Sequence, residues 1–143
     1  MDRRNFIEKS CLTCLAVAIG GVTLNSCSSM KTVNSFANDG YLILDKTEFV
    51  DANTQEEYNS IIVTSNSLKT PLILFKTGAD SYEAISLECT HKGVKLDLVE
   101  DKLECSAHGS IFERNGKVIK GPAKKDLKRY SVDKTLTTIK IQL

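Results

Sequence analysis

Residues 89–110 read CTHKGVKLDLVEDKLECSAHGS, and the interpretation of the chain starts from the two ends of this stretch. Each end, CTHKG and CSAHG, holds one cysteine, one histidine and one glycine. The chain of 143 residues has five cysteines, three of them in the first 27 residues, and only two histidines. Each histidine lies within three residues of one of the two remaining cysteines. This pairing indicates two ligand boxes of one metal centre, formed by Cys89, His91, Cys105 and His108.

The residues between the boxes are expected to form a hairpin. Thirteen residues separate His91 from Cys105, and they contain the segment 96–99 (LDLV), a turn at 100–101 and the pair 103–104. A hairpin here brings both boxes side by side at its base, with two sulfur and two nitrogen ligands facing a gap. A 2Fe–2S centre with mixed ligation needs two thiolates on one iron and two imidazoles on the other. Gly93 and Gly109 would let the two loops turn tightly around the metal.

The segments around this stretch predict an all-β domain. Turn signals separate short runs that are rich in apolar, β-branched and aromatic residues. The runs are 41–44, 61–64, 72–75, 82–87, 111–113, 117–119 and 135–142. Asn115-Gly116 is a strong hairpin signal between two of them. Residues 45–60 are ambiguous, and 54–58 are expected to form at most one helical turn. Many short strands favour an antiparallel sandwich or barrel.

The first 27 residues are interpreted as a targeting segment. Arg3 and Arg4 resemble the start of a twin-arginine signal, and residues 11–24 are an uncharged apolar run of 14 residues, shorter than the ~20 that span a bilayer. Residues 24–27 (LNSC) resemble a lipoprotein processing site with Cys27 as the lipidated residue. Simple cleavage and an uncleaved anchor are the alternatives. Residues 28–39, rich in Ser and Asn, are expected to be a flexible tether to the domain at 40–143.

The composition limits the classes of partner. The net charge of +1 gives no basic footprint of the kind that binds nucleic acid. No nucleophile–base pair and no phosphate-binding loop is found, so a complete enzyme is not indicated. Lys124, Lys125, Lys128 and Arg129 form a short basic run, interpreted first as a solvated face and second as a docking patch for an acidic redox partner.

The boxes CTHKG and CSAHGS resemble the C-x-H and C-x-x-H pattern of the Rieske 2Fe–2S family. Residues 121–123 (GPA) resemble the proline loop that covers the cluster in that family, and the resemblance extends over residues 40–143. It implies a Rieske-type antiparallel β-sandwich with a small cluster-binding subdomain and one 2Fe–2S cluster. It also implies that Ser110 donates a hydrogen bond to a cluster sulfide.

Three departures from the high-potential members of this family are visible. Val94 and Ala107 stand where the cytochrome bc and b6f members have the cysteines of a loop disulfide. Phe112 replaces a tyrosine donor, so an intermediate reduction potential is expected. Lys92 stands where quinol-oxidising members place an apolar residue.

The predicted function is that of a membrane-tethered Rieske protein that carries single electrons on the periplasmic side. Its expected partners are redox proteins, with a cytochrome or a quinol as candidates. The first alternative is the Rieske subunit of a quinol-oxidising cytochrome bc complex or the small subunit of an arsenite-oxidase-like enzyme. A soluble ferredoxin for a ring-hydroxylating oxygenase is another, which the export signal disfavours. A zinc-stabilised binding module without a redox role is the last.

Overall fold

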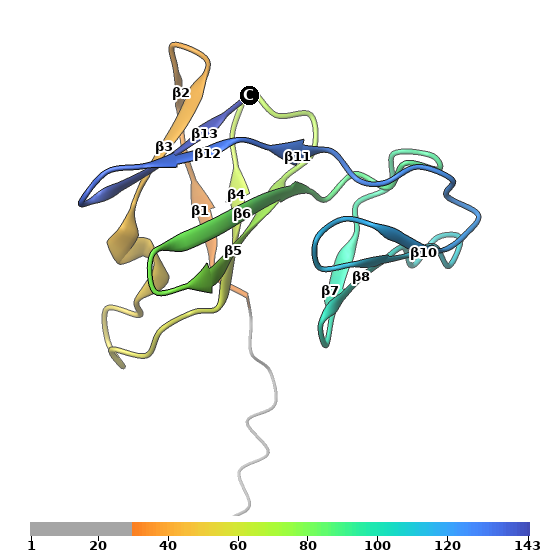
Figure 1. Ribbon diagram of the computed structural model, residues 1–143, viewed down its shortest axis with the longest axis horizontal. Helices are drawn as coiled ribbons and strands as arrows, with labels where there is room; N and C mark the ends of the chain where they lie inside the picture. The colour runs from red at the N-terminus through yellow and green to blue at the C-terminus, as the bar shows by residue number, and fades with distance from the viewer. Residues whose placement is uncertain (1–29) are drawn as a thin grey trace, which may run out of the picture.

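The computed structural model describes residues 30–143, and these form three small β-sheets (Figure 1). The predicted signal segment at 1–27, including the lipidation site at Cys27, lies outside the described residues. In the part described, the one helical element is a 3-10 turn, η1 (Lys46–Phe49). The all-β prediction is therefore confirmed. No helix within residues 30–143 is long and apolar enough to cross a bilayer.

The first sheet has five strands in the order β1-β4-β5-β6-β11. Their bounds are β1 (Thr32–Asn34), β4 (Ser60–Thr64), β5 (Leu72–Gly78), β6 (Ser81–Ser86) and β11 (Arg129–Tyr130). All pairs are antiparallel except β1 with β4, which is parallel. The run LILF at 72–75 is fully buried along β5, as expected for a strand covered on both faces.

The second sheet has the order β12-β13-β3-β2 and covers one face of the first. Its strands are β2 (Ala37–Asn38), β3 (Tyr41–Asp45), β12 (Val132–Lys134) and β13 (Thr138–Gln142). Ile139 pairs with Leu44 and Ile141 with Leu42, and all four side chains are buried. The alternating pattern at the end of the chain thus places every second residue in the core.

The third sheet is a separate small unit at the other end of the molecule, away from β2 and β3 (Figure 1). It has the order β10-β9-β8-β7, with β7 (Asp97–Val99), β8 (Lys102–Glu104), β9 (Ile111–Glu113) and β10 (Val118–Lys120). The predicted hairpin between the two boxes is β7–β8, and the Asn115-Gly116 signal lies in the β9–β10 connection. This unit is the small subdomain.

Strands β5 and β6 supply two different cores from alternate residues. Leu72, Leu74 and Ala84 belong to the core against the second sheet. Ile73, Phe75 and Ile85, together with Leu87 just after β6, belong to a core shared with the small subdomain. The first sheet is therefore the middle layer, and it positions the small subdomain from one face while the second sheet supports the other.

Two local predictions differ from the structure. Residues 32–34 and 37–38 of the predicted tether are strands β1 and β2, which pair with β4 and β3, so the folded domain begins before residue 40. Residues 54–58 do not form the expected helical turn: the turn spans 52–54, where the Asp51 carboxylate accepts the backbone N–H groups of Asn53 and Thr54, and Glu57 pairs with Val50 in an isolated bridge. The helical turn is at 46–49 instead.

Candidate metal centre

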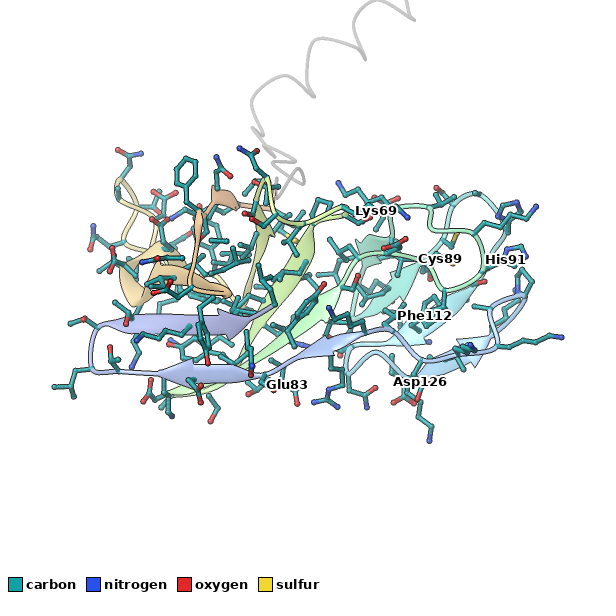
Figure 2. All side chains as sticks on the ribbon, turned by 90° about the horizontal axis from the view of Figure 1, so that it is seen from above. Lys69, Glu83, Cys89, His91, Phe112 and Asp126 are labelled. Carbon is teal, nitrogen blue, oxygen red and sulfur yellow. The ribbon has the colours of Figure 1, made fainter. Side chains whose placement is uncertain are left out.

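The two predicted ligand loops lie at the base of the β7–β8 hairpin. Cys89 follows β6, and a bridge between Glu88 and Lys95 closes the first loop. Asp97 pairs with Glu104, the residue before Cys105, so the hairpin register fixes where the second loop begins relative to the first. Figure 2 shows Cys89 and His91 at the end of the molecule opposite the second sheet.

The loops have the same backbone hydrogen bonds. In the first, the Gly93 N–H donates to the Cys89 carbonyl at 2.8 Å and the Cys89 N–H donates to the Val94 carbonyl at 2.9 Å. In the second, the Gly109 N–H donates to the Cys105 carbonyl at 2.8 Å and the Cys105 N–H donates to the Ser110 carbonyl at 2.9 Å. Gly93 and Gly109 have positive φ angles of 72° and 76°, which residues with a Cβ atom rarely adopt. The cysteine–glycine spacing of four residues therefore creates two matched turns.

The two cysteines are not joined by a disulfide, and their side chains are buried in the core beneath the small sheet. Cys89 is 1% exposed and Cys105 is 2% exposed, and both belong to the same cluster of buried side chains. A buried cysteine with no metal or base beside it is chemically inert. The thiolate form binds metal, and two buried thiolates on neighbouring loops could hold one iron between them. Burial of both sulfurs is a feature that the sequence analysis did not specify.

The histidines approach each other from opposite loops. Their ring centroids are 4.8 Å apart and the rings are nearly perpendicular, at 88°. His91 is half-buried, and its Nδ1 is a buried nitrogen without a hydrogen-bond partner in the structure. His108 is exposed. Burial, followed by the positive charges of His108 and Lys92, lowers the pKa of His91 below its ordinary value and so favours the neutral imidazole that binds metal.

The donor set fits a mixed-ligand 2Fe–2S cluster. A buried, unpartnered imidazole nitrogen beside a second imidazole supplies the nitrogen side, and two buried thiols supply the sulfur side. Within residues 30–143, no three Cys, His, Asp or Glu side chains lie close enough together to bind a single metal ion. A two-iron cluster does not need such a group, because each iron takes two protein ligands.

A third loop, residues 121–126, is fastened to both ligand loops. The Ala123 N–H donates to the Ser110 hydroxyl oxygen at 3.0 Å, and the Thr90 hydroxyl donates to the Lys125 carbonyl at 2.6 Å. Ser110 is fully buried and Ala123 is nearly so. The Ser110 oxygen is thus an acceptor here, which leaves its hydrogen free to donate elsewhere.

Thr90 is the residue of this site that the sequence analysis did not single out. Its position between two predicted ligands in one box was the available signal. Its partner, however, is a backbone carbonyl 35 residues away, and a contact at that separation leaves no local pattern. Of the predicted positions, Ser110 and the four ligands all lie in this region, and Phe112 is fully buried beneath it. Cys27 is outside the described residues.

Comparisons with known proteins agree with this geometry. The family model described as the Rieske [2Fe-2S] domain matches residues 47–131 of this chain. A cytochrome b6-f complex iron-sulfur subunit of Chlorobaculum tepidum is 41% identical over 54 residues, which cover 36% of this chain and 30% of that protein. A similar subunit from a Synechococcus strain is 38% identical over 61 residues, or 41% of this chain and 36% of that protein. The chain thus matches about a third of the length of these curated relatives.

Two solved structures share the fold. The cyanobacterial plasma membrane Rieske protein PetC3 from Synechocystis PCC 6803 has a TM-score of 0.51 and 27% identity, over 59% of this chain and 87% of that chain. A chain from the complex of oxygenase and ferredoxin in carbazole 1,9a-dioxygenase has a TM-score of 0.53 and 21% identity, over 73% of this chain and 94% of that chain. The second likeness concerns the fold alone.

Proposed function

This chain belongs to the Rieske [2Fe-2S] domain family, and we propose that it carries single electrons through a 2Fe–2S cluster held between its two ligand loops. The Rieske domain binds such a cluster. Cys89 and Cys105 would hold one iron and His91 and His108 the other. Neutral imidazoles in place of two thiolates make the cluster easier to reduce than an all-cysteine one, and this is the chemistry that the group supplies.

The observation that carries this proposal is the unpartnered, buried Nδ1 of His91. A buried nitrogen without a hydrogen bond is costly, and it lies in a ring 4.8 Å from that of His108. A metal on the histidine side would satisfy this atom. The matched turns at Cys89 and Cys105 hold the two thiols beneath the same loops.

The chain's own residues would serve the cluster in three ways. Buried cysteines keep the sulfur side away from water, while the exposed His108 leaves an edge where an electron can pass to a partner. The Ser110 hydroxyl, fixed by the Ala123 N–H, has a hydrogen to donate to a sulfide. Such hydrogen bonds stabilise the reduced, more negative cluster and raise its potential.

The domain is proposed to work at a membrane on the periplasmic side. The predicted twin-arginine signal and the lipidation site at Cys27 support this, as does the likeness to a protein described as a plasma membrane Rieske protein. Radiolabelled palmitate incorporated by the wild-type chain and lost in Cys27→Ala would bear out the anchor. Equal release of both chains into the soluble periplasmic fraction would contradict it.

A second candidate is the Rieske subunit of a quinol-oxidising complex or the small subunit of an arsenite-oxidase-like enzyme. Ser110 and the b6-f relatives favour it. Lys92, an exposed charge beside His91, weighs against quinol docking, and Val94 and Ala107 replace the disulfide cysteines. Reduction of the purified protein by a quinol only when a cytochrome b subunit is present would support this candidate over a free carrier.

The test of the main proposal is the EPR spectrum of the dithionite-reduced protein, with iron and acid-labile sulfide measured on the same sample. We expect a Rieske-type signal together with two irons and two sulfides per chain. A folded, colourless protein that contains zinc and no iron would contradict the proposal and support the zinc-stabilised binding module.

A further inference from the structure

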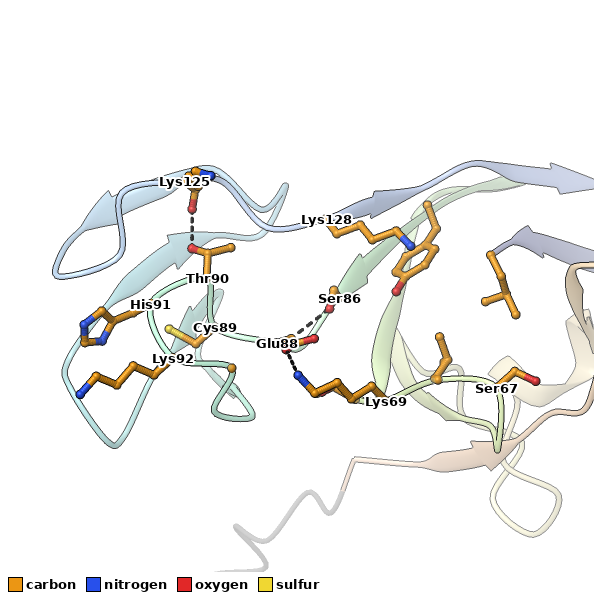
Figure 3. A pocket seen from close by; sticks show the side chains of 15 residues that line it. Ser67, Lys69, Ser86, Glu88, Cys89, Thr90, His91, Lys92, Lys125 and Lys128 are labelled. Atoms are coloured by element: carbon orange, nitrogen blue, oxygen red, sulfur yellow. Dashed lines mark hydrogen bonds and ion pairs between the residues drawn. The ribbon is translucent and has the colours of Figure 1, made fainter.

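A groove of about 760 Å³ separates the first ligand loop from the first sheet (Figure 3). His91 and Lys92 line it from the ligand loop, Lys125 and Lys128 from the segment after the proline loop, and Lys69 from the connection between β4 and β5. The groove therefore begins at a proposed cluster ligand and extends toward the body of the domain.

The groove has an excess of positive charge. Its four lysines are all exposed, and Glu88 is the one carboxylate side chain among its lining residues. Glu88 is already paired with Lys69 at 2.8 Å. Within residues 30–143, no carboxylate lies within 4.0 Å of Lys92, Lys125 or Lys128. Elsewhere Lys31, Lys46, Lys76 and Lys134 each pair with an acidic side chain.

Two of the lysines, Lys125 and Lys128, make contacts that leave their ammonium groups without a carboxylate partner. The Lys128 ammonium lies 4.3 Å from the centre of the Tyr130 ring, and both residues line the groove. The Lys125 backbone is fixed by the Thr90 hydroxyl. Asp126, the carboxylate next in sequence, accepts the Val118 N–H and is thereby tied to β10 rather than to these lysines. The positive charge is therefore not neutralised from within the loop.

The surface beside His108 differs from the lysine-lined groove because it is formed by small, uncharged residues. Ser106, Ala107 and Gly109 in its own loop, and Gly121 and Pro122 in the neighbouring loop, are exposed, small and uncharged. A partner can therefore approach the His108 edge closely. Charges that border such an edge steer an oppositely charged partner and fix its orientation.

We propose that the lysine groove docks an acidic segment of a redox partner protein, whose carboxylates pair with Lys92, Lys125 and Lys128. This inference rests on the proposed function, since docking there places the partner's redox centre beside the histidines. One electron would then pass between the cluster and that centre, with no bond made or broken.

The first test measures binding and needs no electron transfer. A fluorescein-labelled octaglutamate peptide is titrated with the full chain at about 10 mM ionic strength, where screening is weak, and anisotropy is recorded. The triple variant K92Q/K125Q/K128Q is compared with K102Q/K117Q/K140Q, which removes the same charge from lysines outside the groove. We expect the groove variant to lose affinity about tenfold and the control less than twofold.

Equal losses in the two triple variants would overturn the proposal, because they would show attraction to net charge only. It would also be overturned if the groove variant lost binding to phosphatidylglycerol vesicles but not to the peptide, which would make the groove a lipid site. Both variants must show the wild-type EPR signal. Absence of that signal in the wild-type chain defeats the proposed function, whereas an intact signal with equal peptide binding in all chains defeats only the docking site.

The second test measures the oxidation rate of the reduced protein by hexacyanoferrate(III) and by tris(phenanthroline)cobalt(III), which carry opposite charges. The ratio of the two rates cancels any change in reduction potential caused by Lys92→Gln. We expect the hexacyanoferrate(III) rate divided by the cobalt(III) rate to fall roughly five- to tenfold in the groove variant, because the lysines attract the anionic oxidant. The same ratio should stay within twofold of the wild-type value in the control. An unchanged ratio would contradict the proposal.

Discussion

The two faces of the first sheet carry cores of different chemistry. The core against the second sheet is made of hydrocarbon and aromatic side chains on β3, β4, β5, β6 and β13, strands of five to seven residues. The core against the small subdomain includes the thiols of Cys89 and Cys105, and each of the four strands of the third sheet has three residues. The difference implies that apolar burial alone specifies the larger part, whereas the small subdomain depends on its loops and on the cluster that they are proposed to hold.

The largest effect is expected from His108→Ala. Removing one of two nitrogen ligands should abolish the cluster, so that iron and sulfide fall from two per chain to about zero. The two larger sheets should stay folded, because the core between them does not include the ligand loops. Metal analysis, EPR and circular dichroism measure these outcomes. Ser106→Ala, in the same loop and exposed, is the control that keeps the cluster; a His108→Ala protein that retains the EPR signal would remove His108 from the ligand set.

Substitution of two buried leucines, one in each core, tests whether the two cores are independent. Leu74→Ala and Leu103→Ala should each lower the free energy of unfolding by about 2–5 kcal/mol, since both side chains are fully buried. Leu74 belongs to the core of the second sheet, whereas Leu103 lies opposite Phe112 beneath the ligand loops. We therefore expect Leu74→Ala to keep two irons per chain and Leu103→Ala to lose iron faster to a chelator. Equal iron release would show that the two cores are not independent.

Ser110→Ala should have a smaller effect, confined to the small subdomain. The buried Ala123 N–H would lose its acceptor, which costs about 1–3 kcal/mol. The reduction potential should fall, because the hydroxyl could no longer donate to the reduced cluster. Urea unfolding and a redox titration measure the two quantities. A potential equal to or above that of the wild-type protein would argue that the hydroxyl only fastens the third loop.

The smallest effect concerns an exposed turn on the larger part. Backbone N–H groups of Thr54 and Asn53 and the hydroxyl of Tyr58 lower the pKa of Asp51 to about 2, below its ordinary 3.8. The carboxylate therefore stabilises the fold above about pH 4, and this contribution is lost as the pH falls toward 2. NMR titration of the Asp51 carboxyl carbon should give the same low pKa in the wild-type chain and in His108→Ala. A normal pKa in His108→Ala would mean that cluster loss disturbs the larger part.

The sequence predicted the ligand boxes and most strands because both leave local signals. The apolar run at 72–75 and the alternating residues at 139–142 indicate strands without reference to partners, and cysteine–histidine spacing indicates ligation. Strands β1 and β2 were missed because Thr32–Asn34 and Ala37–Asn38 are polar or short and become strands only by pairing with β4 and β3. The Thr90–Lys125 contact was missed for the same reason, since its two ends are brought together only by the third loop.

The most direct measurement uses the fact that the chain has only two histidines. Growth with ¹⁵N-histidine labels His91 and His108 alone, and pulsed EPR of the reduced protein then detects nitrogen bound to the cluster. The account predicts strong ¹⁵N couplings from two imidazoles in the wild-type chain. Couplings from one imidazole or none, in a protein that contains two irons and two sulfides, would contradict ligation by both histidines.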